Sequence, residues 1–412
     1  MKLNFKQRLA GLLVILAVIG PGIITSNVDN DAGGIATYSL AGAQFGYTLL
    51  WISIPVLILL VIVQEMCSRL GVVTGKGLAD LIRENFSLRM TFIIMSALVI
   101  VNITNTISEF AGIAAASEIF GISRYFAVPL SGLFVWWIIL KSNYKSVEKV
   151  FLAACVFYIA YLISGFMVKP DWAIVAKASI IPTFHFSKVY IMAIVGIIGT
   201  TIAPWMQFYM QSSIVEKGIK KEELKYSRID VIVGSFLAVI VAFFIVLTTA
   251  ATIFKSGVNI ETASDAALAL GPLAGKYAEY LFAFGLLNAS LFAASILPLS
   301  TAYSVSEAFG WELGVNRKFS EARRFYGLYG LMIILGMVFV LIPGFNLITL
   351  MYFSQVLNGI LLPFVIILML ILINKNDLMG EYKNGKIYNI IIWLSSIIII
   401  LLSVAMVYLM IF

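Results

Sequence analysis

The sequence predicts an all-α, polytopic membrane protein, and its composition and its long apolar segments are the two observations that predict it. Hydrophobic residues make up 61% of the 412 residues and charged residues only 12%, and the mean hydropathy is +1.01. Runs of about 20 apolar residues are long enough to cross the roughly 30 Å of hydrocarbon in a bilayer. Lipid offers no partners to free backbone groups, so such runs must be helices. We therefore expect a single transmembrane domain over residues 1–412.

About eleven such segments follow one another along the chain. The expected spans are 9–41, 46–68, 91–117, 125–141, 148–168, 188–214, 229–254, 275–308, 325–343, 346–374 and 388–411. The first is expected to be a membrane helix rather than a secretory signal, because its apolar run is long, lacks an A-x-A cleavage site and continues into further spans.

The distribution of basic residues predicts the orientation of these helices. With a cytoplasmic N-terminus, only six of the 28 Lys and Arg residues fall on the outer side: Arg124, Lys169, Lys177, Lys188, Lys255 and Lys276. The positive-inside rule then predicts a cytoplasmic N-terminus and an outer C-terminus in the plasma (inner) membrane. The same asymmetry accounts for the net charge of +7 without a nucleic-acid partner. We expect the chain to function in the lipid bilayer as a monomer.

The first and sixth spans each carry residues that weaken a helix. The sequence DAGG at residues 31–34 interrupts the first span, and Gly196, Gly199 and Pro204 lie in the sixth. Pro lacks a backbone donor and Gly lowers helix stability, so both spans are expected to unwind there and turn free carbonyl groups toward a cavity. Such kinks are also common packing features of membrane helices, but their matched positions favour a binding site.

The spacing of the two weakened spans predicts an internal repeat. They are five spans apart, which fits two five-helix halves of opposite orientation. We place these halves at approximately 1–170 and 185–374, followed by one additional helix at 388–411.

Ionisable residues inside membrane spans are costly, which makes them the first functional candidates. Asp31 lies at the first break, where a carboxylate beside free carbonyls suits Mg²⁺, Ca²⁺ or Mn²⁺. Asp29, two residues earlier, is expected to point elsewhere, either lining a vestibule or remaining solvated. Glu109 in the third span suits either a hydrated path or a hydrogen bond between helices. Gln355 in the tenth span offers an amide oxygen for a cation or a link between helices.

Several segments occur in the order and spacing of a known family. DAGGIATYSLAGAQFGYTLLW, RLGVVTGKGLAD, ISEFAG, GIIGTTIAPW and SQVLNGILLPF resemble the Nramp divalent-metal transporters over nearly the whole chain, and AGAQFGY is a specific match. The resemblance implies a LeuT-like fold, with two inverted repeats of five helices and an additional C-terminal helix. It also implies a transporter rather than an enzyme, whose substrate is a divalent metal ion and which needs no cofactor.

Two motifs depart from the family pattern at the metal site. Where the family has Asp-Pro-Gly-Asn in the first span, this chain keeps Asp31 but has Gly34 in place of the asparagine. Where the family has Met-Pro-His in the sixth span, Ala203 replaces the methionine, whose soft thioether favours transition metals. The space vacated suits water around Mg²⁺, which dehydrates reluctantly, and the pattern resembles the Nramp-related magnesium transporters. The resemblance assigns three further groups to the ion: the carbonyls of Val28 and Thr200 and the side chain of Gln355.

The residues with which conventional members of the family couple transport to protons are also replaced. Trp205 stands in place of the sixth-span histidine and Thr106 in place of a third-span aspartate, while Glu109 is retained. The single histidine, His185, lies in an expected outer loop. Because histidine is the side chain that titrates near neutrality, we expect alternating-access uptake of Mg²⁺, with or without Mn²⁺, that is not coupled to protons.

Three alternatives stay open at this point. A conventional proton-coupled Mn²⁺/Fe²⁺ transporter shares the fold but needs softer ligands and a proton relay. A sodium-coupled organic-solute carrier shares the architecture, but Asp31 and the family segments favour an inorganic cation. A membrane-embedded enzyme needs a nucleophile with a base or a His/Glu metal cluster, and the sequence offers neither.

Overall fold

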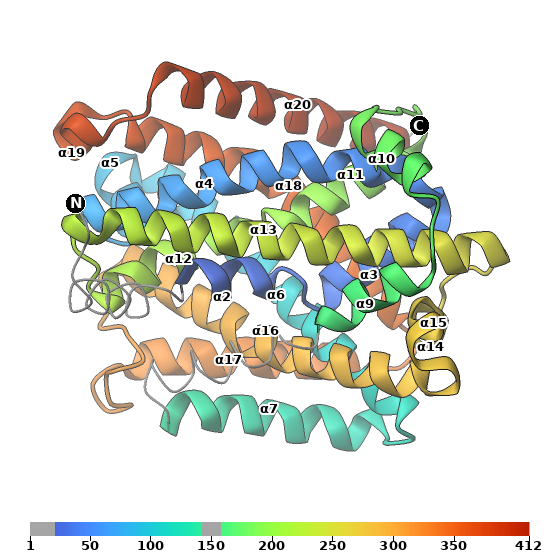
Figure 1. Ribbon diagram of the computed structural model, residues 1–412. Helices are drawn as coiled ribbons and strands as arrows, with labels where there is room; N and C mark the ends of the chain where they lie inside the picture. Colours follow the sequence, from blue (N-terminus) through green and yellow to red (C-terminus); the bar gives the residue numbers. More distant parts are fainter. Residues whose placement is uncertain (1–20, 142–157, 412) are drawn as a thin grey trace, which may run out of the picture.

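A computed structural model describes residues 21–141 and 158–411, and every regular element within these ranges is a helix (Figure 1). The longer helices are α2 (Pro21–Val28), α3 (Ala32–Phe45), α4 (Ser53–Thr74), α6 (Leu88–Ile119), α7 (Arg124–Lys141), α9 (Ile159–Met167), α11 (Lys188–Thr201), α12 (Pro204–Lys217), α13 (Leu224–Thr249), α16 (Ala278–Phe309), α17 (Arg323–Leu341), α18 (Leu347–Ile373) and α20 (Lys386–Ile411). The connections contain α5 (Leu78–Asn85), α10 (Trp172–Ile180), α14 (Ala263–Ala267), α15 (Gly271–Ala274) and α19 (Asn376–Met379). Short 3-10 segments are η1 (Gly46–Ile52), η3 (Lys221–Glu223), η5 (Leu268–Leu270), η6 (Gly275–Tyr277) and η7 (Gly380–Tyr382), and η4 (Ala250–Phe254) is a π-helical turn.

Each of the eleven predicted spans has a helical counterpart in the described part of the chain. By length and composition alone, nine helical stretches within residues 21–141 and 158–411 are apolar enough to cross a membrane. The eleven predicted spans correspond to nine helical stretches for two reasons. The segment η1 joins α3 to α4 into one continuous stretch, and α9 is short where its span is described. The start of the first span and most of the fifth, at 142–157, lie outside the described residues.

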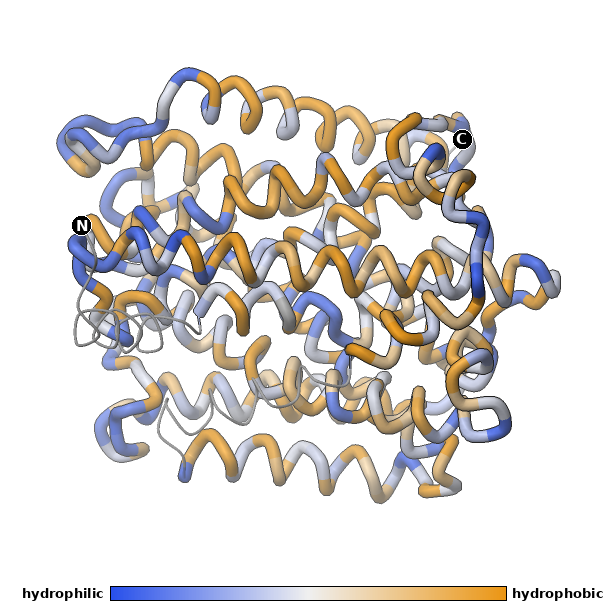
Figure 2. The backbone as a smooth tube through the Cα atoms, in the orientation of Figure 1, coloured by the Kyte–Doolittle hydropathy of each residue, from blue (hydrophilic) through white to orange (hydrophobic). Residues whose placement is uncertain are grey.

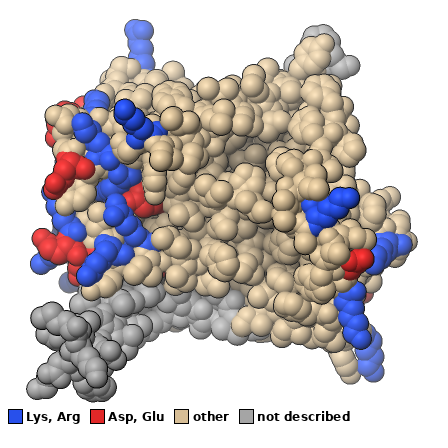
Figure 3. Space-filling model, turned by 45° about the horizontal axis from the view of Figure 1, so that its top comes forward, with Lys and Arg blue, Asp and Glu red and all other residues tan. Residues whose placement is uncertain are grey.

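The helices lie side by side in one bundle whose broken first span is at the centre. In Figure 1, α2 and α3 lie in the middle of the bundle, whereas α7 and α20 occupy opposite edges. The last helix packs against α18 and α11. Hydrophilic segments gather at the two ends of the bundle in Figure 2, and Figure 3 shows Lys and Arg concentrated at one end with an uncharged band beside it. This is the pattern expected of a bundle whose middle lies in hydrocarbon.

Both predicted breaks are present: the first lies a few residues earlier than predicted, whereas the second lies within the predicted stretch, directly before Pro204. The first span is interrupted at residues 29–31, and Gly33 and Gly34 lie in the first turn of α3. The reason is that Asp31 caps α3, which lets the helix restart directly after it. The sixth span is interrupted at residues 202–203, and Pro204 is the first residue of α12, a position where its missing N–H costs nothing.

The sixth-span glycines serve helix packing instead. Gly196 and Gly199 are both inside α11. A Cβ at Gly199 would overlap the backbone of Gln355 and Gly359, and one at Gly359 would overlap the carbonyl of Val195. The backbones of α11 and α18 therefore touch, which fixes α18 beside the second break.

Candidate metal site at the two helix breaks

The carboxylate of Asp31 closes the N-terminus of α3. Its Oδ1 accepts a hydrogen bond of 2.7 Å from the N–H of Gly34, and its side chain also accepts from Gly33. Asp31 is only 4% exposed, so its charge lies inside the protein at the positive end of a helix dipole.

Glu109 reaches the same break from α6. Its Oε2 accepts from the N–H of Ala32 at 3.3 Å, and its carboxyl group is within hydrogen-bonding contact of the carboxyl of Asp31. Gly112, one turn further along α6, allows this approach, because a Cβ there would overlap Ala32 and Ser290. Glu109 therefore lies at the first break, where it makes a hydrogen bond between α6 and α3.

These hydrogen bonds leave backbone carbonyls of the first break without their usual helical donors. In an α-helix the carbonyl of Val28 would accept from the N–H of Ala32, but that N–H donates to Glu109. The carbonyls of Asp29 and Asn30 lose their donors in the same way, because the N–H groups four residues later turn to Asp31. Free carbonyls at the C-terminus of α2 carry partial negative charge and favour a cation.

The second break frees a carbonyl by a different route. The carbonyl of Thr200 would accept from residue 204, which is a proline and has no N–H. The carbonyl of Ala203 accepts from Met206 at 3.0 Å and is thus occupied. The Thr200 carbonyl, at the C-terminal end of α11, therefore lacks its helical donor and is a sixth-span group available to an ion.

The two breaks lie against each other through α3 and α11. The Oγ1 of Thr200 is 3.2 Å from the position of a Cβ on Gly34, and the hydroxyl of Tyr38 is 2.7 Å from that of Thr201. The C-termini of α2 and α11 and the N-termini of α3 and α12 are therefore joined at the middle of the bundle. Such an arrangement of half-helices supplies carbonyls for a cation and N–H groups for a carboxylate.

Gln355 reaches the first break from α18. Its side-chain amide occupies the space beside Gly33, where any Cβ would overlap it. Its Oε1 accepts from Asn358 at 2.7 Å, and Asn358 is in turn bonded to Asn105 of α6. The sequence identified Gln355, but the two asparagines that hold it were missed because their pairing spans 253 residues.

The structure corrects the expectation that Gly34 opens room for water. The place of a Cβ at position 34 is taken by the carbonyl oxygen of Asp29, with which it would overlap. Glycine is therefore required here by the close approach of the backbone at the break. Ala203, which is 2% exposed, lies in the second break and offers a methyl group there.

Asp29 is 2% exposed, which contradicts the expectation that it remains solvated and leaves the vestibule alternative open. Neither of its carboxylate oxygens has a hydrogen-bond partner.

The remaining two candidates, Thr106 and Trp205, make hydrogen bonds to a backbone carbonyl or from a serine rather than to Asp31 or Glu109. Thr106 donates to the carbonyl of Asn102 at 2.8 Å and packs against Gly336 of α17, so its hydroxyl is bonded within its own helix. Trp205 is buried, and its carbonyl accepts from Ser300 of α16 at 3.1 Å. His185 is exposed and contacts the ring of Tyr190.

The ligand set is therefore mixed rather than a cluster of ionisable side chains. Within the described ranges, no group of three or more His, Cys, Asp or Glu side chains is arranged to hold a metal. A cation at the breaks would rely on Asp31, free carbonyls and water, which are hard oxygen donors, and on the Gln355 amide only if its oxygen turns toward the break.

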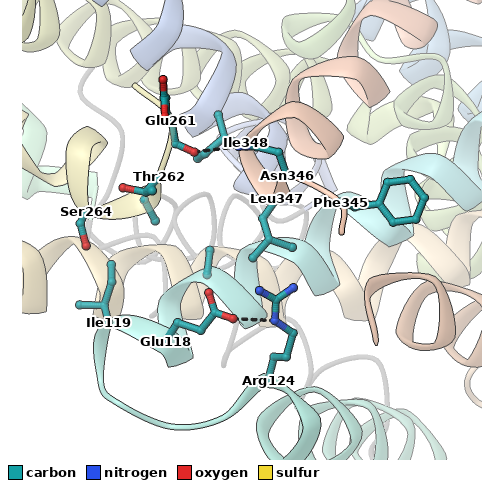
Figure 4. Close-up of a pocket in the computed structure, with 12 residues that line it drawn as sticks. Glu118, Ile119, Arg124, Glu261, Thr262, Ser264, Phe345, Asn346, Leu347 and Ile348 are labelled. Carbon is teal, nitrogen blue, oxygen red and sulfur yellow. Dashed lines mark hydrogen bonds and ion pairs between the residues drawn. The ribbon is translucent and has the colours of Figure 1, made fainter. Parts of the chain in front are cut away.

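A separate cavity of about 380 Å³ lies where α6, α14 and α18 end or begin (Figure 4). It contains the ion pair between Glu118 and Arg124, 2.6 Å long. Asn346 donates to the carbonyl of Glu261 across it. Its lining residues do not include Asp31, Thr200 or Gln355.

Comparisons with known proteins show that nearly the whole chain is similar to one family of sequences. The sequence model described as "Natural resistance-associated macrophage protein-like" (Nramp) matches residues 22–409. The divalent metal cation transporter MntH of Bacillus subtilis is 26% identical over 409 residues, covering 96% of this chain and 93% of that protein. MntH of Clostridium acetobutylicum is 28% identical over 419 residues, covering 98% and 92%.

Solved structures agree in fold. A manganese transporter of Eremococcus coleocola superposes with a TM-score of 0.77 at 24% identity, covering 98% of this chain and 87% of that one. Mhp1, a nucleobase-cation-symport-1 family transporter, gives a TM-score of 0.62 at 14% identity, covering 95% and 90%. These similarities confirm the predicted LeuT-like arrangement of helices.

Proposed function

Because the chain belongs to the Nramp family of transporters, we propose that it carries divalent metal cations across the membrane, with Mg²⁺ as its principal substrate and Mn²⁺ as a possible second one. The ion is substrate, and no resident cofactor is involved. The names of the curated relatives support the divalent cation. The preference for Mg²⁺ is drawn from this chain's own residues.

The observation that carries the proposal is the chemistry of the two breaks. One carboxylate, Asp31, lies beside carbonyls that have lost their helical donors, and the amide of Gln355 lies against the same break. Position 203 contributes a methyl group where a thioether would favour softer metals. Mg²⁺ is bound through one or two carboxylates while it keeps several waters, which this set provides.

We further propose that transport is not coupled to protons. The Thr106 hydroxyl is bonded to its own helix and packed against Gly336, and the only histidine of the chain is exposed at His185. A proton-coupled Mn²⁺/Fe²⁺ carrier is the second candidate, and the contact between Glu109 and Asp31 is the observation that favours it.

We place the chain in the plasma (inner) membrane as a monomer, with its N-terminus in the cytoplasm and its C-terminus outside. The concentration of Lys and Arg at one end of the bundle supports this orientation. The repeat halves at approximately 1–170 and 185–374 are likewise proposed from the matched breaks.

The test is uptake by the purified wild-type protein in liposomes, with Mg²⁺, Mn²⁺ and Cd²⁺ offered separately and in competition. We expect Mg²⁺ to enter and to compete with Mn²⁺. If Mn²⁺ and Cd²⁺ are carried while Mg²⁺ neither enters nor competes at millimolar concentration, the protein is a transition-metal carrier and the proposal of Mg²⁺ as substrate is wrong. An organic-solute panel in the same liposomes tests the carrier alternative.

A further inference from the structure

Asp29 is a buried carboxylate that the described protein leaves unbalanced. It is 2% exposed, and both of its carboxylate oxygens lack a hydrogen-bond partner. Arg69 is the only buried basic residue in the described ranges, and it pairs with Glu65 at 2.9 Å. A buried carboxylate without a partner is expensive unless it takes up a proton or meets a cation, and no group of the described residues pairs with Asp29.

The groups around Asp29 are oxygen donors from α3 and α11. Asp29 lies within electrostatic reach of both Asp31 and the hydroxyl of Tyr38. That hydroxyl is 2.7 Å from the hydroxyl of Thr201 and is also in contact with the hydroxyl of Thr200. No hydroxyl of the described helices donates to the carboxylate of Asp29, so this carboxylate is suited to a hard cation or to the water around one.

Asp29 and Asp31 do not converge on one point with Glu109, since no such group of three is arranged as a metal cluster in the described part of the chain. Asp31 faces the N-terminus of α3, where two N–H groups hold it. Asp29 acts on Tyr38 more strongly than Asp31 does, and neither of its oxygens accepts from these N–H groups. An ion bound directly to Asp31 would therefore meet Asp29 across an intervening layer of water.

We propose that Asp29 is the second carboxylate of the cation site and binds the water shell of the ion held at Asp31, with the hydroxyls of Tyr38 and Thr200 lining the same side. The inference rests on the proposed function, because a largely hydrated ion is what such a subsite would select. Two carboxylates then balance one divalent charge within a space built from oxygen donors. A bare, fully dehydrated ion would gain little from Asp29.

The experiment compares Asp29→Asn with the wild type by Mg²⁺ calorimetry and by thermal unfolding in detergent with and without Mg²⁺. The substitution removes charge but keeps shape. We expect the metal-free variant to unfold at a higher temperature than the metal-free wild type, because an unpaired buried charge is gone. Its Kd for Mg²⁺ should rise about tenfold or more, and the stabilisation by Mg²⁺ should fall accordingly.

Asp230→Asn is the matched control, since Asp230 is equally buried but accepts from the N–H of Gly22 at 2.6 Å. It should unfold at a lower temperature while keeping the wild-type Kd. Tyr38→Phe is a second variant that tests the subsite if Asp29→Asn does not fold, and Tyr329→Phe, which loses a buried hydroxyl on α17, is its control. Tyr38→Phe should raise the Kd and Tyr329→Phe should not.

The outcomes separate this inference from the proposed function. A wild type that fails to bind or carry Mg²⁺ overturns the proposed function. A wild type that binds one Mg²⁺ per chain, together with Asp29→Asn and Tyr38→Phe variants whose Kd stays within about twofold of it, overturns the role of Asp29 alone. A wild type that binds Na⁺ at Asp29 independently of Mg²⁺ would also overturn it, because the carboxylate would then serve a separate ion.

Discussion

Asn105 and Asn358 donate to each other through their side-chain amides, each hydrogen bond being 2.9 Å long. The pair joins α6, which carries Glu109, to α18, which carries Gln355. Asn358 also donates to the oxygen of Gln355 at 2.7 Å. The nitrogen Nε2 of Gln355 lies beside Gly33 and donates to Ser354 at 3.2 Å. The Gln355 oxygen therefore faces the break only if all three amides turn over together and the bond to Ser354 is given up. The pair therefore ties the orientation of a metal-site amide to a neighbouring helix.

This relationship predicts that substitutions of the two asparagines have non-additive effects on the stability of the protein. Asn358→Leu or Asn105→Leu alone leaves a buried amide without its partner, whereas the double variant removes both. We expect each single variant to be less stable than wild type, and the double variant to be more stable than the sum of the two effects by about 0.5–2 kcal/mol. Thermal unfolding of the four proteins measures this. Strictly additive effects would show that the two amides are not coupled.

Asp31→Ala should abolish Mg²⁺ transport, because it removes the carboxylate that α3 holds at the break. Asp377→Ala, at an exposed position on α19, is the control and should transport like wild type. Liposome uptake of Mg²⁺ by the three proteins tests this, and size-exclusion chromatography checks that each variant is folded. Wild-type-like uptake by a folded Asp31→Ala protein is incompatible with Asp31 as the main ligand.

An imposed pH gradient should fail to drive Mg²⁺ accumulation when the membrane potential is clamped. The reason is that Thr106 and His185 are both unable to relay protons from where they lie. Simultaneous recording of Mg²⁺ uptake and internal pH tests this. Uphill uptake would reveal a replacement relay, and loss of that uptake in Glu109→Gln would assign it to Glu109.

Gly34→Ala should destabilise the protein by about 1–3 kcal/mol, since overpacking against a backbone atom costs that much. The added methyl group would overlap the carbonyl of Asp29. Gly285→Ala in α16 is a matched control, because no atom lies within 4 Å of its added Cβ. It should be neutral or stabilising by about 0.5–1 kcal/mol. Equal stabilities of the two variants would contradict the required close approach at Gly34.

Ala203→Met should shift preference from Mg²⁺ toward Mn²⁺ and Cd²⁺, because it adds a thioether at the second break. Ala203→Leu is similar in size but has no sulfur, so it separates ligand chemistry from bulk. Liposome uptake with both ions present gives the ratio of Mg²⁺ to Cd²⁺ transport for each variant. If both variants shift this ratio equally, the change in preference is caused by side-chain size alone. Gly34→Asn is not a suitable companion, since its Cβ would overlap the backbone.

The helices and the existence of both breaks could be predicted from sequence because each depends on local properties. Apolar runs, Pro204 and the glycines are visible in short windows. The exact position of the first break was missed because Asp31 acts as a helix cap, which allows Ala32, Gly33 and Gly34 to be helical. The signal was present, since Asp is a preferred cap.

The polar residues near the breaks were predictable from sequence, but the contacts that hold them were not. Asp31, Glu109 and Gln355 could be identified as polar residues within apolar spans. The burial of Asp29, the hydrogen bond from Tyr38 to Thr201 and the pairing of Asn105 with Asn358 depend on which helices become neighbours. Likewise, Gly34 suggested an open space, and only the three-dimensional arrangement shows the carbonyl that fills it.

The broken first span also has a consequence for how the protein is made. Each aspartate near the centre of a helix costs about 2.5–3.5 kcal/mol during insertion by the translocon. Asp29 and Asp31 occur in the same span, yet Asp31 and its neighbours find partners on α6 only after that helix has been synthesised. The first span is therefore expected to enter lipid together with later helices rather than alone. A nascent chain that is stopped before residue 119 should have a weakly anchored first span, whereas a longer one should hold it firmly.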